Sequence, residues 1–216
     1  MRRSFVRFDR DAYRSYTIAS ASGVQLPFDP PADLSGSIGT TLTMSTPIFQ
    51  TFNGKLEVQR SEVPLFPEAA EGRETRAIAS ANLRPTSAIR LEVSQTYSRI
   101  TRRRDDSEFA RTLIPRLRID FQPRRSLFFR AIAEYRAERQ SRLVDPRSGL
   151  PLVVNGFAEG VKSRGLRMDW LFSYEPTPGT AVFVGYGASL ETPSALRQLE
   201  RRDDRVFVKL AYLFRR

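Results

Sequence analysis

The chain has 216 residues, enough for one domain of ordinary size, and it contains no cysteine and no histidine. This composition excludes disulfides, Ser-His-Asp and Cys-His catalysis, and most zinc sites. The formal net charge of +11 comes almost wholly from arginine, since lysine occurs only at positions 55, 162 and 209. Such a balance favours an anionic partner, such as nucleic acid or lipid head groups, or reflects polar positions filled by arginine.

The N-terminal segment, residues 1–35, is predicted to hold a weakly defined first strand and a loop. Aromatic and charged residues over 4–20 alternate imperfectly, and the prolines and glycine of 23–35 favour a loop. A regular meander of strands is expected over 36–216. We therefore predict that residues 1–216 form a single β domain.

Two local signals shape the first part of this meander. Residues 36–50 are predicted to form a strand, and the dipeptide Asn53-Gly54 after it favours a tight turn. Two prolines and a glycine then predict a longer loop over 61–74.

From residue 75, apolar and polar residues alternate with a period of two, which is typical of strands that have two different faces. Segments of this kind lie at 77–83, 89–97, 113–121, 127–135, 166–174, 182–186 and 206–214. Pro115 falls on the apolar side of its segment, where a proline disturbs a ladder of hydrogen bonds.

The connections between these segments alternate in length. Tight turns are predicted near 53–54, 84–87, 122–125 and 175–179, and longer links near 22–35, 61–74, 102–107, 140–163 and 191–204. Outer-membrane barrels have short periplasmic turns and longer external loops. The predicted fold is therefore an all-β, antiparallel, up-and-down transmembrane β-barrel of about ten strands, or the C-terminal portion of a larger one. Both chain ends are expected on the periplasmic side.

Export to an outer membrane requires a signal that the N-terminus does not show. Charged residues at positions 7 and 9–11 interrupt any apolar signal-peptide core. No run of 18 apolar residues predicts a membrane-spanning helix, whereas barrel strands need only about 9–11 alternating residues each. Either this chain is therefore a fragment of a longer protein, or the barrel interpretation is wrong.

One face of the predicted strands is apolar and is expected to contact lipid. Its members are Leu91, Val93, Leu117, Ile119, Leu127, Phe129, Met168, Trp170, Phe172, Val182, Val184, Val208 and Leu210. Aromatic residues at or near the strand ends are expected to form girdles at the two membrane surfaces. These residues are Tyr97, Phe121, Tyr135, Tyr174, Tyr186, Tyr212 and Phe214.

The opposite face carries charges of both signs, which are expected to face a wet lumen. They are Arg90, Glu92, Arg116, Arg118, Asp120, Arg130, Glu134, Arg167, Asp169 and Lys209. Pairs between them would contribute roughly 0–1 kcal/mol each when exposed. The same pattern also suits the solvent-facing side of a soluble sheet.

The stretch from about 75 to 216 resembles the C-terminal part of a family of outer-membrane barrel proteins of undefined function. Four segments carry the resemblance: Ala81-Asn82-Leu83-Arg84-Pro85-Thr86-Ser87, Phe129-Arg130-Ala131-Ile132-Ala133-Glu134-Tyr135, Tyr174-Glu175-Pro176-Thr177-Pro178-Gly179-Thr180 with Val184-Gly185-Tyr186-Gly187, and Arg205-Val206-Phe207-Val208-Lys209-Leu210-Ala211-Tyr212-Leu213-Phe214-Arg215. In that family a carbohydrate-binding domain of the family-9 type precedes the barrel.

This resemblance implies a bacterial outer-membrane location and a pore or scaffold that handles carbohydrate or another nutrient. It implies two partners, the lipid bilayer and the barrel-assembly machinery, the latter through the C-terminal strand. Lumen arginines would favour anionic solutes. Because the chain lacks the family's N-terminal domain, carbohydrate binding is assigned to no residue here.

Two other functions fit parts of the sequence. A soluble basic β-sheet protein could bind nucleic acid or another polyanion by stacking bases on Tyr135 or Trp170, but these share the apolar face instead of interleaving with cations. An enzyme could pair carboxylates from Glu92, Asp120, Glu134 and Asp169, but arginines neighbour each of them. No phosphate loop, metal-ligand spacing or nucleophile motif occurs. We therefore expect no catalytic role, cofactor, metal or nucleic acid.

Overall fold

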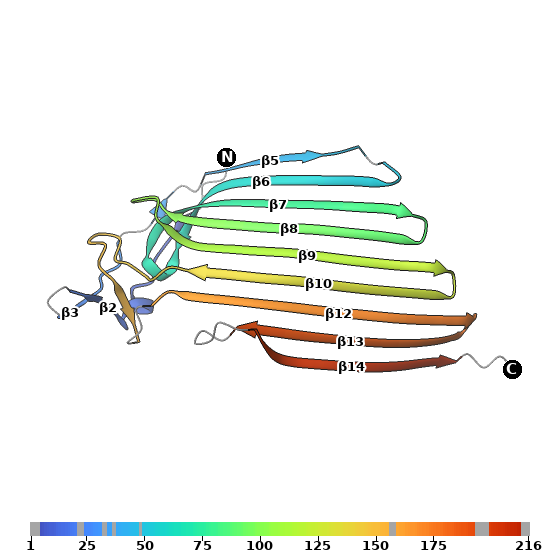
Figure 1. Cartoon of the computed structure of the whole chain (residues 1–216). Coiled ribbons are helices and arrows are strands. Elements are labelled where there is room, and N and C mark those ends of the chain that lie inside the picture. The colour runs from blue at the N-terminus through green and yellow to red at the C-terminus, as the bar shows by residue number, and fades with distance from the viewer. Residues whose placement is uncertain are drawn as a thin grey trace.

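The computed structural model describes residues 5–20, 24–31, 34–35, 38–47, 49–155, 159–192 and 199–212. The protein is all-β, and its main body is one antiparallel sheet of nine strands, the main sheet (Figure 1). The spatial order is β14-β13-β12-β10-β9-β8-β7-β6-β5. Each strand of the main sheet thus pairs with its neighbours along the chain. Among the described strands between β5 and β14, β11 is the one that joins a smaller sheet instead.

The strands of the main sheet are long, and most of them exceed twelve residues. They are β5 (Gly39–Ser45), β6 (Phe52–Leu65), β7 (Ala70–Thr86), β8 (Ile89–Arg102), β9 (Glu108–Arg124), β10 (Leu127–Gln140), β12 (Val161–Thr177), β13 (Thr180–Thr192) and β14 (Glu200–Tyr212). In the described residues the sheet is open, because β5 and β14 each pair on one side only.

The two ends of the main sheet differ, as the alternation of turns and links predicted. Tight turns at 87–88, 125–126 and 178–179 close three hairpins at one end, the turn end, on the right in Figure 1. Gly179 takes a positive φ of 91°, which a glycine adopts without a steric penalty. The opposite end, the loop end, carries the long link of 141–160, as predicted. The link at 103–107 is only a short charged loop.

Two predictions in the first part of the meander are wrong. Asn53 and Gly54 do not form a turn but pair inside β6 with Asn82 and Ala81, and the turn lies earlier, at 46–51. The side-chain amide of Asn82 donates to Asn53 at 3.0 Å. A dipeptide that favours a turn locally is held extended here, because β7 offers a full ladder of hydrogen bonds.

The longer loop predicted over 61–74 is also wrong. β6 continues to Leu65 and β7 starts at Ala70, with only a short 3-10 helix, η2 (Phe66–Glu68), between them. Ala69 completes the link in the left-handed region, with φ of 47°. Gly72 lies so close to Leu65 that a β-carbon there would stand 2.7 Å from its Cδ2. The glycine therefore serves close packing within the strand pair.

The predicted first strand over 4–20 does not join the main sheet. β1 (Phe5–Val6) pairs with β4 (Leu34–Ser35), and β2 (Tyr16–Ala19) lies between β3 (Gln25–Pro27) and β11 (Leu152–Val154). The short helix η1 (Arg10–Tyr13) separates β1 from β2. The expected count of about ten strands is therefore nine in the described main sheet. The chain enters this sheet at the loop end and leaves it at the turn end, instead of starting and finishing on one side.

The small core of the molecule lies at the loop end, in a unit we call the cap. It is formed by residues 5–20 and 24–31 packed against η2, Ala69 and the 141–155 link (Figure 1). Its buried apolar residues are Phe8, Tyr13, Phe28, Ala69 and Leu152. These aromatics contact one another edge to face, which explains why the N-terminal segment folds on itself instead of extending as a strand.

Pro115 interrupts one ladder, as its position on the apolar side predicted. β9 pairs continuously with β8 past Gln95 and Pro115. On the other side, the pairing with β10 skips from Arg116 and Glu134 to Leu113 and Ala137. Proline has no N–H to donate, so the hydrogen bonds on that side are missing.

Candidate functional site: the two faces of the main sheet

The register of the main sheet gathers the predicted apolar residues on one surface, the apolar face. Leu91 lies opposite Ile119, which lies opposite Ala131 on β10. The same row continues through Trp170, Tyr186 and Val206 on the last three strands. The remaining predicted lipid-facing residues share this face by the same pairing: Val93, Leu117, Leu127, Phe129, Met168, Phe172, Val182, Val184, Val208 and Leu210.

The apolar face extends beyond the residues predicted for it. On β5 and β6 it includes Leu42, Met44, Leu56 and Val58, which continue the rows of β7. Aromatic rings pack along its centre. The ring centroids of Phe129 and Trp170 lie 6.5 Å apart in a stacked arrangement, and those of Trp170 and Tyr186 lie 6.2 Å apart.

No described segment of the chain covers the apolar face. Leu210 is 74% exposed, Val206 70% and Met44 60%, and even central Trp170 keeps 38% of its surface accessible. Large contiguous apolar patches on a protein surface mark sites of interaction with lipid or with other proteins. The apolar face is therefore the candidate interaction surface of the described chain.

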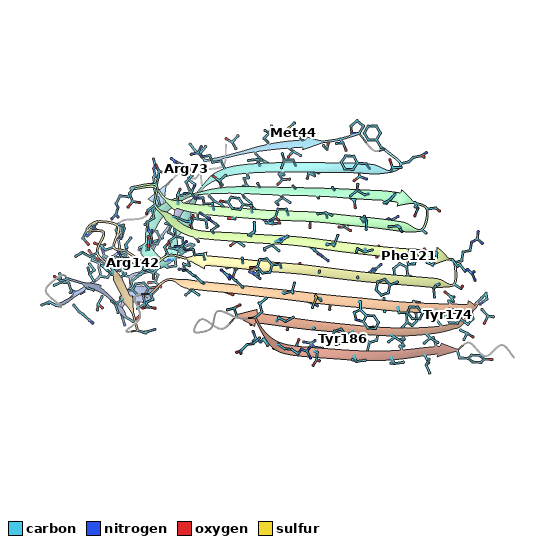
Figure 2. All side chains as sticks on the ribbon, viewed as in Figure 1. Met44, Arg73, Phe121, Arg142, Tyr174 and Tyr186 are labelled. Atoms are coloured by element: carbon cyan, nitrogen blue, oxygen red, sulfur yellow. The ribbon has the colours of Figure 1, made fainter. Side chains whose placement is uncertain are left out.

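The aromatic residues of this face follow oblique lines. Near the turn end, Phe121 lies opposite Phe129 of β10, and Tyr174 lies opposite Leu127. From β9 to β12 the line thus shifts toward the turn end by about one residue per strand. It continues to Tyr212, two residues beyond Leu210 on β14. Figure 2 shows Phe121 and Tyr174 near the turn end.

A second line runs parallel to it, nearer the loop end. Tyr97 lies on the row of Leu113 and Ala137. Tyr135 lies two residues closer to the turn end than Ala137 on β10. Tyr186 was predicted at a strand end, but it lies within β13 opposite Trp170 (Figure 2). Phe214, the remaining predicted girdle residue, lies outside the described residues.

The opposite surface, the polar face, carries all the predicted lumen charges. Asp120 is its most connected carboxylate, with Arg118 at 2.9 Å and Arg130 at 2.8 Å. Arg118 also reaches Glu92 at 3.8 Å, and Arg116 reaches Glu134 at 3.9 Å. Arg167 and Asp169 pair at 3.0 Å. Arg90 and Lys209 also lie on the polar face, because they are opposite Asp120 and Phe183 on the neighbouring strands.

A hollow of about 460 Å³ lies on the polar face over β10, β12, β13 and β14. Three arginines and two aspartates line it: Arg130, Arg167, Arg205, Asp169 and Asp203. The hollow therefore offers alternating charges with a small excess of cations, a lining suited to polar or anionic solutes.

The Val-Gly-Tyr-Gly segment of β13 makes room for the lining of this hollow. A β-carbon on Gly185 would overlap the ring of Phe207, and one on Gly187 would stand 2.6 Å from Asp169 Oδ1. Tyr186, between these glycines, points to the apolar face. The two glycines thus let large side chains of neighbouring strands lie flat across β13.

A buried ion pair at the loop end was not predicted from the sequence. The guanidinium of Arg102 donates to Glu68 through Nε at 2.8 Å and Nη2 at 2.5 Å. Arg102 also donates to the backbone oxygens of Arg142 and Glu108, and Glu68 accepts from the amide of Val144. Glu68 is only 1% exposed. The pair therefore ties two parts of the cap, η2 and the 141–155 link, to β8 and β9.

The described residues contain no group of acidic side chains that could hold a metal ion. The carboxylates considered for acid/base chemistry, Glu92, Asp120, Glu134 and Asp169, share the polar face but each contacts an arginine. Within the described part of the chain, no helix has the length and apolar character needed to cross a membrane.

Comparisons of the chain with models of protein families, with curated proteins and with solved structures find no match.

Proposed function

We propose that the chain forms part of the wall of a bacterial outer-membrane β-barrel, the C-terminal portion of a larger barrel that acts as a pore or scaffold. The observation that carries this proposal is the apolar face, which runs in register across nine strands and lies uncovered. Lipid is a partner able to cover such a face at full width, because barrel strands present alternate residues to the bilayer.

The oblique aromatic lines support the same proposal. Residues rise about 3.3 Å along a strand and strands lie about 4.8 Å apart, so a step of one residue per strand corresponds to a tilt of about 35°. Outer-membrane barrel strands are tilted by about 35–45°, and their aromatic girdles lie level with the membrane surfaces. A level girdle on tilted strands crosses the hydrogen-bonded rows obliquely. With this step the second line reaches β13 at Ala188, two residues from Tyr186, so a position within β13 instead of at its end is expected.

The polar face would then line the interior. Its charges pair across and along strands, which keeps a polar surface satisfied without a covering layer of protein. The hollow with its excess of arginine suits anionic solutes, and carbohydrate is the second class that the family resemblance implies. The last strand, β14, is the element that the barrel-assembly machinery would bind.

Trp170 offers a direct test, because it is the only tryptophan and lies on the apolar face. We expect its fluorescence in phosphatidylcholine vesicles to be quenched strongly by lipids brominated in the acyl chains and weakly by acrylamide. The matched control is the double variant W170F/F183W. It moves the tryptophan to the polar face, where Phe183 lies opposite Ser173 and Lys209.

In this control the order of quenching should reverse, with acrylamide the stronger quencher. Equal quenching of both proteins by acrylamide, with no effect of brominated lipid on Trp170, would show that the apolar face does not contact acyl chains. Migration in SDS gels with and without boiling provides a second readout, because folded barrels resist SDS at room temperature.

A further inference from the structure

A row of cations crosses the apolar face on the loop-end side of its aromatic residues. Arg99 lies directly opposite Arg111, Arg111 opposite Arg139, and Arg139 opposite Lys162. On the other side of Arg99, Thr75 of β7 lies between Arg99 and Arg60, so Arg60 extends the row to β6. Arg164 lies on the same face of β12 as Lys162, two residues closer to the turn end. We call these six residues the basic row. All of them are exposed.

The basic row is short of negative charge. Like charges directly opposite each other on neighbouring strands are destabilising. Glu108 compensates two of them, with Arg99 at 3.4 Å and Arg111 Nε at 3.0 Å. Within the described chain, Arg60, Arg139, Lys162 and Arg164 have no carboxylate at ion-pairing distance. The six cations and Glu108 together carry a net charge of +5, and Glu62, two residues beyond Arg60 on the same face of β6, pairs with Arg103 at 3.5 Å.

The polar face at the same height differs. There Arg136 pairs with Glu138 at 2.6 Å, and Ser98 donates to Glu74 at 2.7 Å. These residues alternate along the same strands as the basic row but point the other way. The excess of cations is therefore specific to the apolar face, so a general abundance of arginine does not account for it.

The position of the row indicates what anion it meets. Arg99 follows Tyr97 by two residues, and Arg139 follows Tyr135 by four, so the cations lie on the loop-end side of the aromatic line, closer to it on β8 than on β10. Neighbouring strands hold their side chains about 4.8 Å apart, and the row from β6 to β12 spans about 24 Å. Adjacent guanidinium groups at this spacing can share the oxygens of one phosphate.

We propose that the basic row binds the phosphate groups of lipid head groups in the leaflet at the loop end. This inference rests on the proposed membrane location and adds the chemistry of the leaflet. Phosphates would remove the repulsion between facing arginines.

The test compares the full chain in vesicles of phosphatidylcholine alone and with phosphatidylglycerol added, using R139Q/K162Q as the row variant. The matched control R136Q/R167Q removes two cations from the polar face of the same strands, β10 and β12. Each cation near an anionic surface contributes about 1 kcal/mol, so the row variant should partition roughly thirtyfold more weakly into the anionic vesicles. The control should partition like the unmodified chain.

The outcomes separate the two proposals. Quenching of Trp170 by brominated lipid in both vesicle types, with equal partitioning of the row variant and the control, overturns the basic row and leaves the membrane location intact. Loss of that quenching in every vesicle overturns the membrane location itself. Inorganic phosphate that reproduces the gain in phosphatidylcholine vesicles, or tighter binding of a DNA oligonucleotide than of anionic vesicles, also contradicts a lipid site.

Discussion

The cap and the main sheet satisfy their apolar residues in opposite ways. The cap is small, yet it buries Phe8, Tyr13, Phe28 and Leu152 within its own fold. The main sheet is several times larger and leaves Leu210, Val208 and Met44 accessible. The cap therefore resembles an ordinary water-soluble unit, whereas the sheet obtains no core from the described chain. Changes in the cap should act in any solvent, and changes on the apolar face should act only where lipid is present.

The largest effect on the cap is expected from Glu68→Ala. This change leaves the guanidinium of Arg102 buried without its carboxylate, which costs about 3–5 kcal/mol of unfolding free energy. Hydrogen exchange of the amides around η2 and the 141–155 link should report the loss. The matched control, Glu57→Ala, breaks the exposed pair with Lys55 and should cost less than about 1 kcal/mol. Equal effects of the two variants would contradict a stabilising role for the buried pair.

The corresponding change on the sheet is Phe172→Arg. Phe172 lies opposite Phe129 and Val184 on the apolar face, so an arginine there should cost about 2–4 kcal/mol of folding free energy in a bilayer near its midplane. Ser173→Arg, one residue away on the polar face, should be mild. Folding yield into lipid vesicles, read from gel migration, compares the two. Similar yields would remove the distinction between the faces.

A smaller effect is expected from Tyr13→Phe in the cap. The hydroxyl of Tyr13 donates to the backbone oxygen of Phe66 at 2.6 Å, and burial raises the pKa of this phenol. Loss of the hydroxyl should cost about 0.5–1.5 kcal/mol, measured as a shift in denaturant midpoint. The same substitution at Tyr174, on the apolar face, serves as a control, and it should leave the cap unchanged. A Tyr13→Phe midpoint equal to that of the unmodified chain would show that the contact contributes nothing.

The smallest effect concerns pH at the loop end. Hydrogen bonds from Ser107 and Arg104 lower the pKa of Asp105 from 3.8 to about 2. A lowered folded-state pKa stabilises the 103–107 loop above the unfolded value, and this stabilisation disappears as pH falls toward about 2. Amide exchange of this loop should accelerate over that interval, and Asp105→Asn should remove the dependence. A loop whose exchange shows no added acid dependence relative to the variant would contradict this assignment.

The sequence predicted which residues share a face of the sheet, because successive residues of a strand point to opposite faces and alternation therefore assigns every residue to one of them. Alternation alone assigns Leu117 to the apolar face and Arg118 to the polar face. Pairing of β9 with β8 and β10 then places residues of the same kind opposite each other on each face. Local turn chemistry was less reliable. Asn53-Gly54 and Pro64 both favour breaks, but β7 pairs with β6 through both positions, and this tertiary pairing decided the structure.

The buried pair at the loop end had no signal in the sequence. Glu68 and Arg102 belong to two segments that were both predicted to be loops, and they lie 34 residues apart. Burial of such a pair depends on the fold of the cap, which in turn depends on aromatic contacts among residues without a regular period. Oblique aromatic lines are also invisible before the register is known, because they relate positions on different strands.

The direction of the edge strands limits how the wall can be completed. β5 and β14 are the first and last members of a nine-strand meander, so they run the same way. Joining these edges directly would create a parallel seam, and so would placing two copies side by side in the same orientation. An entirely antiparallel ring forms only if the added strands are odd in number. A single additional strand, or any odd set, would satisfy this parity, whereas an added hairpin would not.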